Sequence, residues 1–169
     1  MKLSAQTRTA MRILLQVGSS QDLVSTRTIA DAQGMSQKFI TTVIVPLKRA
    51  GFIDVKRGVK GGIALAKAPS GISIVDVMET FQGPIRLLEC LSESQACPQK
   101  PKCPLHAGCR KINAALKETL GRFTLADGLK ELAELRRQNP DDPDSCLRKG
   151  VFIERLLSGE NAGRTWRGC

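Results

Sequence analysis

The chain has 169 residues, of which 41% are hydrophobic and 25% are charged, a composition typical of a soluble globular protein. Lys and Arg outnumber Asp and Glu by 26 to 16, so the net charge of +10 favours a polyanionic partner such as nucleic acid. No apolar run approaches the roughly 20 residues of a membrane span, and the N-terminus lacks the continuous apolar core of a signal peptide. These features exclude an integral membrane protein, and we expect a cytoplasmic protein with no membrane partner.

Charge and cysteine are distributed unequally along the chain. Residues 1–67 contain 11 Lys and Arg against 3 Asp and Glu, whereas residues 68–169 contain 15 against 13. All six cysteines lie in the second part. Because a cytoplasmic protein keeps its thiols reduced, these cysteines are more typical of metal ligands than of a disulfide framework. The distribution predicts a basic module followed by a metal-binding module.

The basic module, residues 1–82, has the pattern of a winged helix-turn-helix domain. A helix with one apolar face is followed by a short helix, a tight turn at Gly34, and a third helix that Ser36 caps. Residues 52–57 and 63–66 are then expected to form two strands joined by a glycine-rich tip. The predicted fold is therefore mainly α with a small β-hairpin wing, followed by a long dimerisation helix and a cluster-binding loop.

Polar and basic side chains of this module are candidates for contacts with DNA. Hydrogen-bonding residues at the start of the third helix suit base edges and phosphates, and basic residues of the hairpin suit phosphates or a minor groove. The predicted DNA-binding residues are Arg27, Ser36, Gln37, Lys38, Thr41, Thr42, Lys56, Arg57 and Lys60. The alternative is a three-helix core whose basic face is only solvated. The segregation of charge and the hairpin favour DNA binding.

Metal-ligand side chains gather in the second module. Cys90, Cys97, Cys103 and Cys109 have the spacing C-x6-C-x5-C-x5-C, and His106, the one histidine of the chain, lies among them. This spacing fits neither the C-x2-C pairs of a zinc ribbon nor those of a ferredoxin. A loop of Ser, Gln, Lys and Pro is suited to wrapping around a cluster. Reduced structural thiols and a structural zinc are the alternatives.

A long helix is predicted to begin at the end of the cysteine segment. Pro104 is typical of the first helical position, which makes Cys103 the N-cap and places His106 about one turn away. The positive end of the helix dipole favours a thiolate at Cys103. Apolar residues repeat every four positions and are predicted to form a homodimer interface, with packing inside the chain as the alternative. These residues are Ile112, Leu116 and Leu120.

The sequence thus divides into four parts. Residues 1–82 are the winged helix-turn-helix DNA-binding domain and residues 83–104 are the cysteine-rich cluster-binding loop. Residues 105–138 form the dimerisation helix and a following helix, which Thr124 caps. Residues 139–169 form an acidic, proline-containing linker and a C-terminal appendage that we expect to be partly disordered.

Ordered motifs from Met1 to about residue 135 resemble the IscR/NsrR group of winged-helix iron–sulfur transcription regulators. They include MKLS at 1–4, IA at 29–30, GMS at 34–36, PLKRAGF at 46–52, RGVKGG at 57–62, the three cysteines 90, 97 and 103, and TLAD at 124–127. The resemblance implies a homodimer that binds near-palindromic promoter DNA. It also implies a [2Fe-2S] or [4Fe-4S] cluster that senses iron, redox state or nitric oxide.

The resemblance also implies a ligand set. Cys90, Cys97 and Cys103 match the three ligand cysteines of the group, and His106 matches the histidine ligand of its [2Fe-2S] regulator of cluster biogenesis. Cys109, where that regulator has an aromatic residue, is the alternative fourth ligand and would permit an all-cysteine site. Because His106 matches the histidine ligand of the [2Fe-2S] regulator, we favour a [2Fe-2S] cluster over a [4Fe-4S] cluster.

Two departures limit what is carried over from the group. The nitric-oxide-sensing branch has an acidic ligand where this chain has Arg8, and a glutamate used in discriminating DNA sites is replaced by Thr41, so no operator sequence is implied. An electron-transfer module and a zinc-stabilised DNA-binding protein are the alternative functions. An enzyme is not expected, because a single histidine and no nucleophile–base pair leave no catalytic residues to assign.

Overall fold

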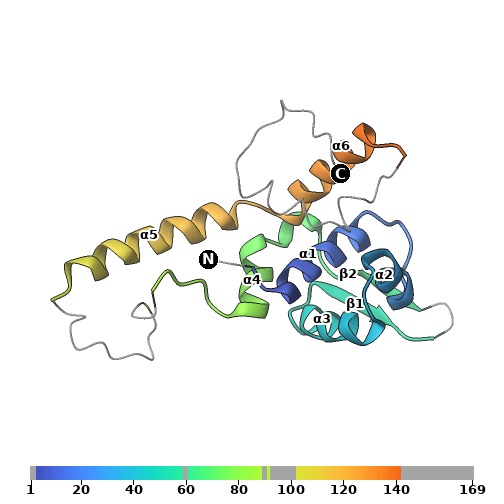
Figure 1. The fold of residues 1–169 in the computed structure, drawn as a ribbon, viewed down its shortest axis with the longest axis horizontal. Helices are drawn as coiled ribbons and strands as arrows, with labels where there is room; N and C mark the ends of the chain where they lie inside the picture. Colours follow the sequence, from blue (N-terminus) through green and yellow to red (C-terminus); the bar gives the residue numbers. More distant parts are fainter. Residues whose placement is uncertain (1–2, 59–60, 89–90, 92–101, 142–169) are drawn as a thin grey trace.

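The structure is a computed structural model that describes residues 3–58, 61–88, 91 and 102–141. It confirms the predicted class, which is mainly helical with one antiparallel hairpin (Figure 1). The elements in chain order are α1 (Ala5–Gly18), α2 (Thr26–Gln33), α3 (Gln37–Arg49), β1 (Ile53–Lys56), β2 (Gly62–Leu65), a 3-10 turn (Pro69–Gly71), α4 (Ile74–Gln82), α5 (Pro104–Gly121) and α6 (Leu125–Gln138).

Hydroxyl side chains set where most of these helices begin. At each such N-cap the side-chain oxygen accepts a hydrogen bond from the backbone N–H three residues further on, which satisfies one of the free donors of the first turn. The capping residues are Ser4, Ser25, Ser36, Ser73 and Thr124. α5 differs, because its N-cap is Cys103 with a proline in the first turn, as the sequence predicted, and the thiol caps no N–H. The predicted starts at Ser36 and Thr124 are confirmed.

The wing is a short hairpin that is tied to the helical body. β1 and β2 pair antiparallel, with Val55 opposite Ile63. Ile63 also forms a bridge with Val24, in the loop before α2, through backbone hydrogen bonds of 2.9 and 3.0 Å. Gly62 permits this contact, because a Cβ there would lie 2.8 Å from the Cβ of Leu23. The base of the wing is therefore fixed relative to the helix-turn-helix.

α1 lies at the centre of the core. Its buried face packs against α3, α4, β2 and α6. α6, grouped above with the dimerisation helix, folds back onto α1 and buries Leu132, which is 1% exposed (Figure 1). The core therefore takes in the last helix as well as the winged domain. The largest fully buried side chains are Ile13, Leu14, Ile29, Ile40, Leu47, Ile53, Ile63, Ile72 and Leu132.

α5 extends away from the rest of the described chain (Figure 1). The starts of α4 and α6 meet at an isolated bridge that pairs Ser73 with Thr124. There the Ile74 N–H donates to Phe123 O at 2.9 Å and the Leu125 N–H donates to Ile72 O at 2.8 Å. No helix in the described ranges is long and apolar enough to cross a membrane.

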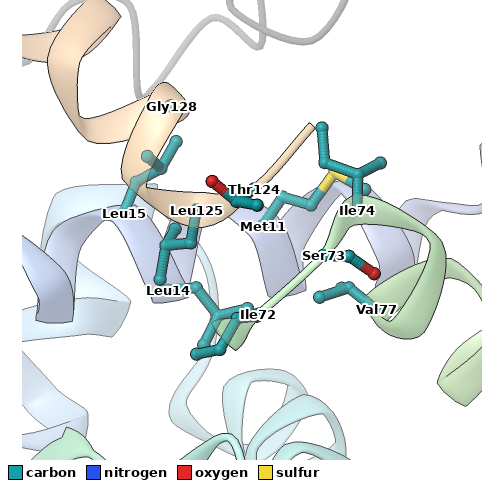
Figure 2. A pocket seen from close by; sticks show the side chains of 10 residues that line it. All are labelled: Met11, Leu14, Leu15, Ile72, Ser73, Ile74, Val77, Thr124, Leu125 and Gly128. Atoms are coloured by element: carbon teal, nitrogen blue, oxygen red, sulfur yellow. The ribbon is translucent and has the colours of Figure 1, made fainter. Parts of the chain in front are cut away.

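A small pocket lies beside this bridge, between α1, α4 and α6. Figure 2 shows that apolar side chains of all three helices line it, among them Met11 and Leu14 of α1. The hydroxyls of Ser73 and Thr124 also border it, but both are engaged in capping their helices. The pocket is therefore a packing gap without free polar groups for chemistry.

Candidate functional site

A glycine in the left-handed conformation joins the two helices of the helix-turn-helix. Gly34 has a φ of 61° and ends α2, and the Met35 N–H turns back to donate to Ala30 O at 3.0 Å. Glycine adopts this conformation without the steric penalty that a Cβ brings. Ser36 then caps α3, so this helix begins at Gln37, three residues after Gly34.

The outer face of α3 carries the polar residues that the sequence selected. Its inner face buries Ile40, Val43 and Leu47, while the side chains of Ser36, Gln37, Lys38, Thr41 and Thr42 are exposed. The hydroxyl protons of Thr41 and Thr42 are donated to backbone carbonyls within the helix, at 2.8 and 2.7 Å. Their oxygens therefore face solvent mainly as acceptors.

One exposed residue of α3 was missed by the sequence reasoning. Val45 is 42% exposed and lies one turn after Thr41. An apolar side chain at this place suits the methyl group of a thymine in a major groove. The four-residue spacing from Thr41 was the signal, but valine is apolar and was assigned to neither the core nor the DNA face.

Basic residues outside α3 lie on α2 and on the wing. Lys56 and Arg57 are exposed at the end of β1, while Lys60 lies outside the described residues. Arg27 on α2 is paired with Asp31 at 4.0 Å, and both side chains are more than 70% exposed. An ion pair this exposed contributes little to stability. Arg27 therefore stays accessible for a phosphate contact.

The first turns of α5 bring three potential metal ligands to one face. Cys103, His106 and Cys109 follow one another at intervals of three residues, and all three are partly buried. The imidazole Nδ1 of His106 is buried and has no hydrogen-bond partner in the described part of the chain. A buried polar nitrogen without a partner is costly, and imidazole with thiolates is a donor set that iron and zinc accept. The donor types of these residues fit a metal or an iron–sulfur cluster, but the three described side chains are not gathered into a metal-binding group by themselves.

Two of the predicted ligands lie outside the described residues. Cys90 and Cys97 fall there, and no group of three His, Cys, Asp or Glu side chains able to hold a metal is found among the residues that are described. Cys146 and Cys169, together with the rest of the C-terminal appendage after residue 141, also lie outside. The assignment of the four ligands therefore stays a prediction.

α1 offers cations where the nitric-oxide-sensing branch offers an acidic ligand. The helix has no acidic residue, and Arg8 and Arg12 lie one turn apart on it. Arg12 is half-buried, and its Nε has no hydrogen-bond partner in the described ranges. Its pKa is lowered mainly by burial and, to a smaller extent, by the positive charge of Arg8. α1 of this chain therefore provides no carboxylate to a cluster.

The three residues of the predicted dimer stripe on α5 differ in exposure. Leu120 is 6% exposed because the end of α5 packs against the core of its own chain, so it offers a partner little surface, and the predicted interface stays a prediction. Leu116 is partly buried against the same core. Ile112 is 59% exposed and Leu105, which the sequence reasoning did not select, is 72% exposed. The apolar surface left open on α5 is therefore nearer its N-terminal end.

The helix-turn-helix, its polar outer face and the basic hairpin define a winged-helix DNA-binding protein. The chain belongs to the Rrf2 family, described as iron-dependent transcriptional regulators, which it matches over residues 3–131. The HTH-type transcriptional regulator NsrR of Bacillus licheniformis is 32% identical over 140 residues, which cover 81% of this chain and 98% of that protein. The chain is therefore a transcription regulator and not an enzyme.

Solved structures agree with this assignment. CymR, the global cysteine regulator of B. subtilis, has a TM-score of 0.61 at 26% identity, over 78% of this chain and 98% of CymR. T. potens IscR has a TM-score of 0.55 at 28% identity, over 78% of this chain and 88% of that chain. The resemblance to regulators of the IscR/NsrR type is thereby confirmed.

Proposed function

We propose that this regulator binds promoter DNA as a homodimer in the cytoplasm and senses iron, redox state or nitric oxide through an iron–sulfur cluster. The proposed ligands are Cys90, Cys97, Cys103 and His106, with a [2Fe-2S] cluster favoured. The observation that carries this proposal is the buried Nδ1 of His106, which has no hydrogen-bond partner among the described residues and lies one turn after Cys103.

His106 is favoured over Cys109 as the fourth ligand for two reasons. Its buried Nδ1 has no hydrogen-bond partner among the described residues and would gain one interaction by binding a metal. A half-buried thiol needs no such partner, since it behaves as a small apolar group when buried. In addition, α1 has no acidic residue to take the fourth place. A cluster with mixed Cys and His ligands supplies one-electron chemistry at a higher potential than an all-cysteine cluster.

The fold gives the proposed site a way to influence DNA binding. α4 packs against α1 and α3 in the DNA-binding domain and against α5, and the cysteine segment follows α4 directly. Ligands on both sides of that segment would hold the end of α4 and the start of α5 together. A ligand shifts an equilibrium only by its differential affinity for two states, and here the states would differ in the placement of α5.

Spectroscopy of anaerobically purified protein tests the proposal. We expect visible absorption with matching iron and sulfide, and we expect serine at Cys90, Cys97 or Cys103 to abolish it. His106→Ala should destabilise the cluster or shift its potential, whereas Cys109→Ser, the matched control one turn away, should be nearly silent.

Three other outcomes would contradict parts of this proposal. The opposite ranking of the His106 and Cys109 variants would indicate an all-cysteine site and favour a [4Fe-4S] cluster. Full colour in Cys97→Ser would refute the ligand assignment. Specific promoter binding by a protein that holds no iron and sulfide would agree with a transcription regulator and would refute the proposed cluster.

A further inference from the structure

Side chains from two helices hold the backbone that leads into the cysteine segment. The Asn113 carboxamide of α5 binds it twice: its Oδ1 accepts the Leu87 N–H at 2.9 Å, and its Nδ2 donates to Ile85 O at 3.1 Å. A neighbouring β-strand would bind an extended chain in the same way, through one acceptor and one donor. Asn113 thus replaces a strand partner for this segment.

A second contact holds the other side of Ile85. The Glu79 carboxylate of α4 accepts the Ile85 N–H at 3.1 Å, and the same oxygen lies 2.7 Å from the Nζ of Lys117 on α5. The side chain of Ile85 is 6% exposed in the core. We call Glu79, Asn113 and Lys117 together with Ile85 the Ile85 latch. It binds both backbone polar groups of Ile85 and connects α4 to α5.

The latch lies on the face of α5 that carries the potential ligands. Asn113 follows Cys109 by four residues and His106 by seven, which at 1.5 Å per residue is about 6 and 10 Å along the helix. Position 90 follows Leu87 by three residues, a reach of about 11 Å at most. Fixing Leu87 on Asn113 therefore fixes the last described residues before the cysteines against the face of α5 that carries His106.

We propose that Asn113 is a positioning residue for the cluster site. This inference rests on the proposed function. Asn113 holds residues 85–87, which precede Cys90 in the chain, against the face of α5 that bears His106. Because Glu79 belongs to α4, the latch also links the placement of the cluster to the DNA-binding domain.

The test uses the full chain with Asn113→Ala, Asn113→Asp and the control Lys111→Ala, an exposed residue of the same helix. In metal-free protein, amide hydrogen exchange at Leu87 should be about tenfold faster in Asn113→Ala, since one net hydrogen bond is lost. Asn113→Asp keeps the acceptor for Leu87 and loses the donor to Ile85, so its Leu87 exchange should stay near that of the unmodified chain. Lys111→Ala should change nothing.

The cluster provides the second readout. Under a chelator, the visible absorption of Asn113→Ala should decay about tenfold faster than that of the control, with a changed visible circular dichroism spectrum and an unchanged thermal unfolding midpoint. Unchanged exchange at Leu87 would refute the latch. Faster exchange with an unchanged cluster lifetime and spectrum would refute the positioning role. A wild-type protein without iron and sulfide would refute the proposed function and this role together, while the exchange data would still decide whether the latch exists.

Discussion

The open apolar face of α5 allows a direct test of dimerisation with the variant Ile112→Asp. Ile112 is 59% exposed in the single chain, so most of its surface is available to a partner. Complete burial of an aliphatic side chain contributes about 1.5–3 kcal/mol, and the exposed share of Ile112 would contribute roughly 0.9–1.8 kcal/mol. A two-fold axis uses the residue twice, which gives roughly 2–3.5 kcal/mol for the dimer. The dimer dissociation constant should therefore rise about 30- to 300-fold, at about 1.4 kcal/mol per factor of ten.

Sedimentation over a range of protein concentrations measures this change. Ala114→Asp is the matched control, because Ala114 is also exposed and points to a different side of the same helix. Thermal unfolding of the Ile112→Asp monomer should match that of the control, since the residue is not part of the core. Operator affinity should fall, because each monomer reaches only one half-site. Equal dissociation constants for the two variants would refute this location of the interface.

Two further predictions concern the wing and α6. Arg57→Ala, at the exposed end of β1, should weaken binding to a cognate promoter by about 1–3 kcal/mol and make the salt dependence shallower by about 0.9 in a plot of log K against log salt. An unchanged salt dependence, measured beside the control Arg122→Ala, would show that Arg57 contacts no phosphate. Thr124→Ala should cost about 1 kcal/mol in thermal unfolding at neutral pH, because it removes the N-cap of α6. Hydrogen bonds from the Thr124 side chain and backbone lower the pKa of Asp127. A carboxyl group with a lowered pKa stabilises the fold at pH values above its ordinary pKa of about 3.9. This stabilisation is lost as the pH falls through the lowered pKa, so the cost of Thr124→Ala in unfolding free energy should shrink in that acidic range. A cost independent of pH would contradict this coupling.

Local signals in the sequence were sufficient to predict where helices begin and where the chain turns. A capping hydroxyl and a glycine turn act within a few residues, so the starts of α3 and α6 and the turn at Gly34 could be predicted. The polar face of α3 followed from the same periodicity that identified its buried face. These are properties of one segment of chain and do not depend on what packs against it.

The sequence pattern could not predict the contacts between segments that are distant in the chain. The four-residue repeat on α5 showed an apolar stripe but not its partner, and Leu116 and Leu120 of this stripe meet the core of their own chain. Asn113 and Glu79 look like ordinary polar residues of two helices, and nothing in their spacing shows that both bind the backbone of Ile85. His106 and Cys109 share one helix face, so spacing alone did not rank them.

The bridge between Ser73 and Thr124 has a consequence for how such regulators change during evolution. The two residues meet at the starts of α4 and α6, and each also caps the helix that follows it. Insertions or deletions between α4 and α5 leave these two starts in place, since α4 packs on α1 and α3 and α6 stays anchored on α1 by its own buried leucines. The segment between α4 and α5 can therefore diverge in length and in cysteine content while the winged-helix part keeps its geometry.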